Sequence, residues 1–198
     1  MAYEYLFISL LAGLYFKLDV FLLNFLKGEE AVGIYTSGYK FLEAFVFLAV
    51  SYNFVAMPQF AKLQKLGTNA LRMRINKDLR ILLSVGILVA FAAFVAFPII
   101  LPYVLQGEYL RAITVSQIVI FALPLILIYS IFLNTLYVLE KAHIAVLIFA
   151  SQAGFNLVLN LIYIPRYSFV ASSYITVFGE ALNVIITFVL VQKYLRKI

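Results

Sequence analysis

Ionisable side chains inside long apolar stretches are the residues of this sequence best suited to chemistry. Such side chains are found at five positions: Lys17, Asp19, Lys40, Glu43 and Glu180. A charge in the hydrocarbon layer costs about 3 kcal/mol on insertion scales, so these groups should face protein or water. Because lysine binds phosphate as a compact point charge, Lys17 and Lys40 can hold an anionic group such as a diphosphate. The three carboxylates can bind a coupling proton or Na⁺, or neutralise the lysines.

Helical spacing predicts which of these side chains share a face. Positions three, four and seven apart lie on one face of a helix. Lys17 and Asn24 therefore share a face, whereas Asp19 points nearly the opposite way from Lys17. We expect each of these two charges to find its partner on a neighbouring helix. Lys40 and Glu43 are three residues apart and can form an ion pair within one helix.

Longer polar stripes occur in the C-terminal third of the chain. They comprise Gln152, Asn156, Asn160 and Tyr163 in one apolar stretch, and Ser172, Thr176, Glu180, Asn183 and Thr187 in the next. One interpretation is helix packing, since such groups hydrogen-bond across membrane interfaces for about 0.6 kcal/mol each. The other is a water-filled cavity, because packing alone rarely needs so many polar residues on one face. In that case Asn156 and Asn160 line the cavity with Lys17, Lys40, Asn24 and Tyr39.

The composition excludes several classes of protein. Hydrophobic residues make up 65% of the 198 residues and charged residues 12%, and the mean hydropathy is +1.04. A soluble domain has about 25% charged residues, so a soluble enzyme is excluded. The sequence has no Cys and one His, which excludes disulfides, thiolate ligands and a multi-histidine metal site. Since no catalytic motif is present either, we expect no enzyme activity, no metal and no cofactor.

The elements that carry these residues are predicted to be membrane helices. A membrane helix needs about 20 mostly apolar residues, and six stretches meet this requirement. They lie near residues 5–26, 32–57, 79–105, 112–139, 144–164 and 169–191. The predicted fold class is therefore an all-α membrane protein, a single bundle of six transmembrane helices over residues 1–198.

The distribution of basic residues predicts the orientation in the membrane. Most of the net charge of +6 lies in the basic segment 59–78, in the loop at Lys141 and near the C-terminus, all on one side of the predicted bundle. The positive-inside rule places that side, and with it both termini, in the cytoplasm, so the charge does not indicate nucleic-acid binding. Residues 59–77 form either an amphipathic helix on the membrane surface or a basic loop that fixes the topology.

Three stretches resemble one family of membrane transporters. The first runs from Asp19 to Lys40 and reads DVFLLNFLKGEEAVGIYTSGYK. The second is MPQFAKL at Met57–Leu63, and the third is NLVLNLIYIPRYS at Asn156–Ser168. In this order they resemble the polysaccharide flippases of the O-antigen and teichuronic-acid type, within the superfamily that includes MATE multidrug exporters and the lipid II flippase. Ser168 and Ala171 stand where that family usually has glycines.

The resemblance implies both a fold and a function. The fold would be one lobe of a MATE-like transporter, corresponding to the C-terminal six-helix half of full members. The function would be export of polysaccharide (such as the O-antigen of lipopolysaccharide) across the cytoplasmic, or inner, membrane as an undecaprenyl-diphosphate-linked oligosaccharide. Such a lobe would work with a second six-helix lobe or as a homo-oligomer within the lipid bilayer.

Two other functions remain open from the sequence. One is a half-transporter for cation-coupled multidrug efflux of the MATE type. The other is a membrane-embedded glycan ligase or polymerase. The latter usually carries catalytic residues in large external loops, and the external loops predicted here are only a few residues long.

Overall fold

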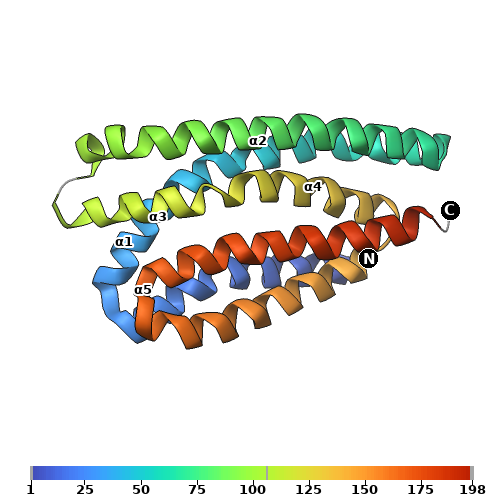
Figure 1. The fold of residues 1–198 in the computed structure, drawn as a ribbon. Coiled ribbons are helices and arrows are strands. Elements are labelled where there is room, and N and C mark those ends of the chain that lie inside the picture. The colour runs from blue at the N-terminus through green and yellow to red at the C-terminus, as the bar shows by residue number, and fades with distance from the viewer. Residues whose placement is uncertain (1, 106, 197–198) are drawn as a thin grey trace.

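The computed structural model describes residues 2–105 and 107–196, and nearly all of them are helical (Figure 1). The helices are α1 (Ala2–Leu66), α2 (Thr68–Val104), the 3₁₀ helix η1 (Gly107–Arg111), α3 (Ala112–Val119), α4 (Ala122–Val138) and α5 (Ala142–Leu195). The described residues contain no strand. The prediction of an all-α protein is therefore confirmed.

Two of the helices double back on themselves. α1 is interrupted at Gly28, with φ 79° and ψ −177°, and α5 at Ser168, with φ 52° and ψ −138°. Figure 1 shows the two stretches of α5 running side by side, whereas the second stretch of α1 rises from its turn and runs on beside α2. Both breaks lie in the left-handed region that favours glycine. Ser168 adopts this conformation with a side chain, at a position where a glycine would be less strained.

Membrane spans follow from helix length and apolarity. Three helices are long and apolar enough to cross a bilayer, within Lys17–Leu66, Thr68–Val104 and Ala142–Leu195. A fourth span results if Tyr109–Val119 and Ala122–Val138, which meet at 44°, are taken as one bent element. Pro124 lies in the first turn of α4, just after this bend, where a missing backbone N–H is tolerated. The chain is thus a multi-pass membrane protein, whereas six crossings stay a prediction.

The basic segment forms the tip of a helical hairpin. α1 continues to Leu66, Gly67 makes the turn with φ 120°, and α2 begins at Thr68. Residues 59–77 therefore belong to the ends of two long helices. This corrects the expectation of a separate amphipathic helix on the membrane surface. The apolar character that suggested such a helix serves the packing of the hairpin, in which Phe60, Leu71 and Ile75 are buried.

Small residues allow the helices to pack closely. A Cβ atom on Gly38 would lie 2.5 Å from the carbonyl oxygen of Ala112, and one on Gly86 would lie 2.7 Å from the Cα of Pro124. These contacts hold α1 against α3 and α2 against α4. The outer surface is strongly apolar, with Phe25 80% exposed and Phe54 79% exposed. Such a surface suits a lipid environment, where apolar side chains face hydrocarbon.

Candidate functional site

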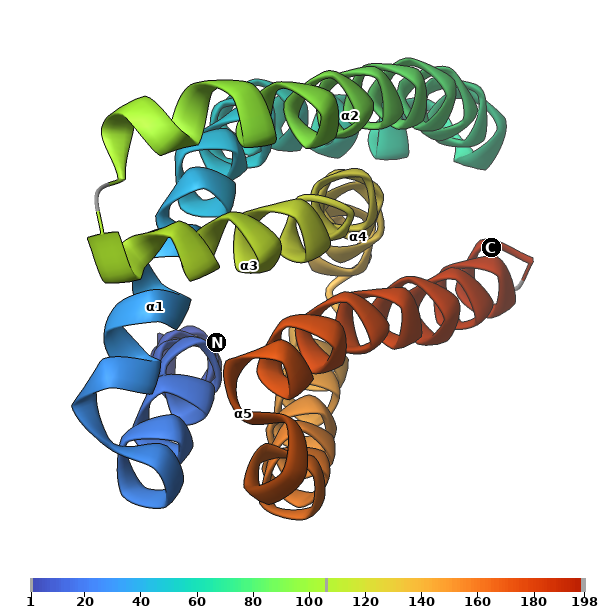
Figure 2. The same cartoon turned by 60° about the vertical axis from the view of Figure 1, so that its left-hand side comes forward.

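A buried hydrogen-bonded cluster joins α1 to α5. The hydroxyl of Tyr35 donates a hydrogen bond to the carboxylate of Asp19 and lies 3.2 Å from the hydroxyl of Thr176. Asp19 is 5% exposed, Tyr35 1% and Thr176 5%. The Gly28 break makes this possible, because it folds the stretch that carries Tyr35 back beside the stretch that carries Asp19 (Figure 2). The cluster therefore links both stretches of α1 to the second stretch of α5.

The same network continues across the two stretches of α5. Thr176 donates to the carbonyl oxygen of Ser172 at 3.0 Å, and the Ser172 hydroxyl donates to Oδ1 of Asn160 at 2.9 Å. Asn160 Nδ2 in turn donates to Oδ1 of Asn156 at 2.8 Å. All four side chains are buried. Asn156 and Asn160 therefore have internal partners, which matches the packing interpretation of their stripe more closely than the cavity interpretation.

Glu180 extends the buried polar face by one helical turn beyond Thr176. It is 5% exposed, and Asn183 Nδ2 lies 3.4 Å from its Oε2. Among the described residues, the Asn183 Oδ1 atom and the Tyr129 hydroxyl are buried without a hydrogen-bond partner. On α4, Asn134 Nδ2 donates to Asn53 Oδ1 at 2.7 Å. Buried polar groups are thus also found beyond the Asp19 cluster, on α5 past Thr176 and on α4.

The two candidate lysines are exposed. Lys17 and Lys40 lie eleven and twelve residues from Gly28, on opposite stretches of α1. At 1.5 Å per residue, both lie about 17 Å from the break. The residues around the break, Lys27 and Glu29 among them, are charged and exposed, which places the break at the membrane surface. For a hydrocarbon core about 30 Å thick, we expect both lysines near its middle.

The remaining candidates on α1 are also open to the outside of the chain. Asn24 and Glu43 are exposed, and Tyr39 is half-buried with its ring 5.4 Å from that of Tyr35. Among the residues that the structure describes, Lys40 and Glu43 form no ion pair. The ion pair that their spacing allows is therefore not formed, and both side chains are exposed.

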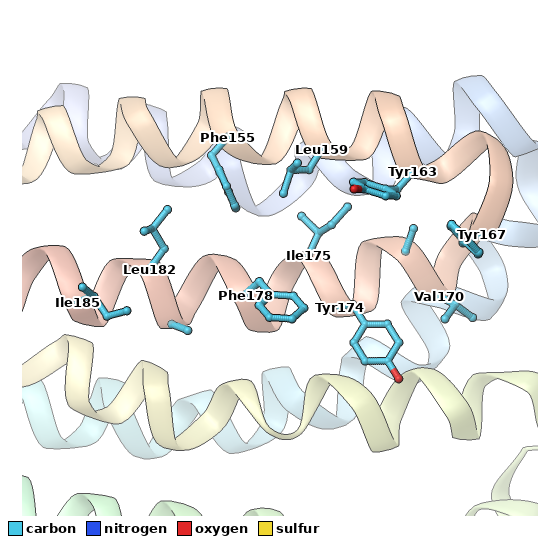
Figure 3. A pocket seen from close by; sticks show the side chains of 12 residues that line it. Phe155, Leu159, Tyr163, Tyr167, Val170, Tyr174, Ile175, Phe178, Leu182 and Ile185 are labelled. Carbon is cyan, nitrogen blue, oxygen red and sulfur yellow. The ribbon is translucent and has the colours of Figure 1, made fainter.

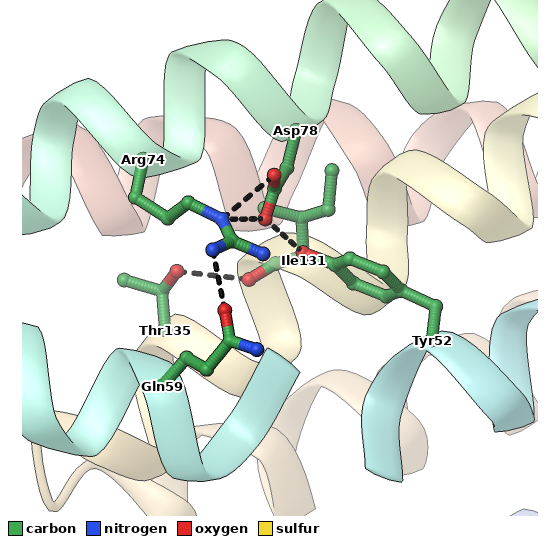
Figure 4. Close-up of polar contacts among 6 residues, drawn as sticks. All are labelled: Tyr52, Gln59, Arg74, Asp78, Ile131 and Thr135. Atoms are coloured by element: carbon green, nitrogen blue, oxygen red, sulfur yellow. Dashed lines mark hydrogen bonds and ion pairs between the residues drawn. The ribbon is translucent and has the colours of Figure 1, made fainter. Parts of the chain in front are cut away.

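The sequence reasoning missed a second polar cluster, at the cytoplasmic end by the predicted orientation (Figure 4). Arg74 Nε donates to both oxygens of Asp78 at 2.8 Å, and the Tyr52 hydroxyl donates to Asp78 Oδ2 at 2.8 Å. Arg74 also donates from Nη1 to Oε1 of Gln59. Asp78 is 5% exposed, so this cluster fastens α2 to the second stretch of α1. In the sequence, the spacing of four residues between Arg74 and Asp78 already indicates that the two can pair on one face of a helix.

We expect removal of the Arg74 side chain to destabilise the protein, because it leaves Asp78 buried with one donor fewer. Arg74→Ala should lower the free energy of unfolding by about 1–3 kcal/mol, and thermal unfolding in detergent measures it. The double variant Arg74→Met, Asp78→Leu should recover part of this loss, because no uncompensated charge remains. Lys77→Ala, exposed on the same helix, is the control. Equal stability of Arg74→Ala and Lys77→Ala would contradict a structural role for the pair.

Together, the fold and this site define a multi-pass helical membrane protein with buried polar clusters and two exposed lysines on α1. Residues 1–64 match the family model described as "Polysaccharide biosynthesis protein". The matched part contains Asp19 and Tyr35 of the first cluster and both exposed lysines, Lys17 and Lys40. The match covers about a third of the chain and relates this part of it to polysaccharide biosynthesis proteins. No curated protein and no solved structure matches the chain.

Proposed function

We propose that this chain is one lobe of a flippase that moves an undecaprenyl-diphosphate-linked oligosaccharide across the cytoplasmic membrane. One observation carries the proposal: Lys17 and Lys40 are both exposed, each about 17 Å along its stretch of α1 from the Gly28 break. At that distance we expect both near the middle of the hydrocarbon core. The family match of residues 1–64 covers both lysines and supports the polysaccharide as cargo. A diphosphate is the part of such a cargo that two ammonium groups recognise.

The exposed charges also support a partner lobe. An ionisable side chain does not face hydrocarbon at mid-membrane depth, because insertion there costs about 3 kcal/mol. We propose that the exposed Lys17, Lys40 and Glu43 are therefore covered by something polar in the membrane. We propose a second lobe, either another six-helix chain or a second copy of this one, with a hydrated cleft between the two.

The proposed lobe crosses the membrane six times. The breaks at Gly28 and Ser168 divide α1 and α5 into two stretches each, and these join α2 and the bent α3–α4 pair. Both termini would then lie in the cytoplasm. The cleft would take up the diphosphate from the cytoplasmic side and open to the outside as the lobes rock, while the lipid tail stays in the bilayer. Asp19 and Glu180, both buried, would carry a coupling proton or Na⁺ or balance the lysines.

Deletion of the gene tests this function directly. We expect loss of surface polysaccharide and accumulation of the lipid-linked oligosaccharide in the inner leaflet, both reversed when the full chain is restored. Surface glycan is measured by gel electrophoresis, and the lipid-linked intermediate by mass spectrometry of extracted lipids. Its leaflet is determined by treating intact spheroplasts with a glycosidase, which reaches only the outer leaflet, before extraction. The alternative of MATE-type efflux predicts unchanged glycan and increased sensitivity to cationic drugs. A ligase or polymerase predicts that the intermediate accumulates in the outer leaflet. Either result would overturn the proposal.

A further inference from the structure

A long apolar groove lies on the outer surface of the bundle, away from the Asp19 cluster. It runs between the two stretches of α5 and has a volume of about 680 Å³ (Figure 3). Phe155, Leu159 and Tyr163 line one wall, and Ile175, Phe178 and Ile185 lie along the other. Several of these side chains are exposed, Phe178 to 65%. The groove is therefore open on the side that faces lipid.

The length of the groove limits what can occupy it. Its second wall extends from Val170 to Ile185, which corresponds to about 22 Å along a helix. One leaflet contributes half of the roughly 30 Å hydrocarbon core, or about 15 Å. A phospholipid tail that stays within its own leaflet would leave part of the groove empty. A longer hydrocarbon chain, one that passes the membrane midplane, fits the whole groove.

The end of the groove near Ser168 carries positive charge. Arg166 is exposed next to Tyr167, which lines the groove, and Lys27 reaches the same turn by donating from Nζ to the carbonyl oxygen of Pro165 at 2.7 Å. The rings of Tyr163 and Tyr167 lie 6.5 Å apart at this end. An apolar channel with cations and tyrosines at one end complements a long lipid with an anionic head at the membrane surface.

We propose that this groove binds the isoprenoid tail of a polyprenyl phosphate or diphosphate lipid, with the phosphate beside Arg166 and Lys27. The proposal rests on the proposed function for the identity of the lipid and adds where its tail is held. The tail site on α5 is separate from Lys17 and Lys40, which lie on α1. By the predicted orientation the Ser168 end is the outer one, so this site would hold the lipid after its headgroup has crossed.

Photolabelling tests the site. The full chain is reconstituted in nanodiscs of phosphatidylethanolamine and incubated with undecaprenyl phosphate that carries a diazirine near its far end. We expect the label on peptides from residues 155–185, found by mass spectrometry. Ala181→Phe fills the groove and should reduce labelling at least tenfold. Ala150→Phe, an exposed alanine on the same helix outside the groove, should leave it unchanged. Arg166→Gln should weaken binding of undecaprenyl phosphate severalfold but not binding of the uncharged alcohol.

Competition and a cellular readout decide the outcome. Excess unlabelled undecaprenyl phosphate should abolish the signal, whereas phosphatidylglycerol should not, and equal competition by both would overturn the proposal. Label spread evenly over the lipid-facing helices would overturn it as well. Surface polysaccharide is measured in parallel for the gene deletion. If the deletion loses polysaccharide while the groove is not labelled, the groove proposal fails and the proposed function stands. If the groove is labelled and the deletion keeps its polysaccharide, the flippase proposal fails.

Discussion

Replacing Lys17 and Lys40 together by alanine is expected to reduce surface polysaccharide at least tenfold without lowering the amount of protein in the membrane. Both side chains are exposed, so their removal leaves no buried group without a partner. Loss of both would remove the two ammonium groups that the proposed cleft offers to a diphosphate. Surface polysaccharide is measured by immunoblotting and normalised to the amount of the chain in purified membranes.

The controls separate a local role from net charge. Lys62→Ala with Lys65→Ala removes the same charge from the exposed end of α1 and should leave polysaccharide near its normal level. Arginine at positions 17 and 40 keeps the charge and should retain most export. Normal polysaccharide in the double alanine variant would refute the diphosphate-binding role of these lysines.

Replacing Asp19 by alanine is expected to destabilise the bundle. The carboxylate accepts from the Tyr35 hydroxyl and from the backbone N–H of Val20; Asp19 and Tyr35 are buried, and Val20 is partly buried. A buried donor left without its acceptor costs about 1–3 kcal/mol, so the alanine variant should unfold at a clearly lower temperature. The measurement is thermal unfolding of the purified protein in detergent, followed by circular dichroism.

Two further variants show what the Asp19 carboxylate does. Asp19→Asn keeps an acceptor for Tyr35 and should recover most of the lost stability. If this folded variant still fails to export polysaccharide, the ionisable character of Asp19 is needed, as expected for a site that binds a proton or Na⁺. Glu43→Ala, which removes an exposed acid from the same helix, should match the wild type in stability. An alanine variant at position 19 with wild-type stability would contradict the structural role of the cluster.

The residue types of the sequence were sufficient to find Asp19 but not its partners. An acid in an apolar stretch must be compensated, and helical spacing correctly directed it away from Lys17. Tyr35 lies 16 residues away and Thr176 lies 141 residues from Tyr35, so only the turn at Gly28 and the packing of α1 against α5 bring them together. Periodicity within one helix contains no information on such contacts between helices.

The ends of the helices show a similar limit. Apolar stretches predicted helices in the right parts of the chain, but the basic segment 59–78 appeared as a loop or a separate helix. The sequence did not indicate the contacts of Asp78 that hold the two helices together. Asp78 follows a run of basic residues, a pattern that is typical of a solvent-exposed charge. In the structure it is buried between two helices, with Tyr52 and Arg74 as donors. Ser168 likewise marks a reversal without the glycine that usually signals one.

The single-residue turn at Gly67 has a mechanical consequence. Since α1 ends at Leu66 and α2 begins at Thr68, no slack separates the two helices. If α1 slid along α2 by one helical turn, about 5.4 Å, the connection at Gly67 would be overstretched. The hydrogen bond from Tyr52 to Asp78 would also break. The second stretch of α1 and α2 must therefore move together as one rigid body. Flexing would then fall to the Gly28 reversal at the opposite end and to the bend between Val119 and Ala122, which lies partway along the bundle.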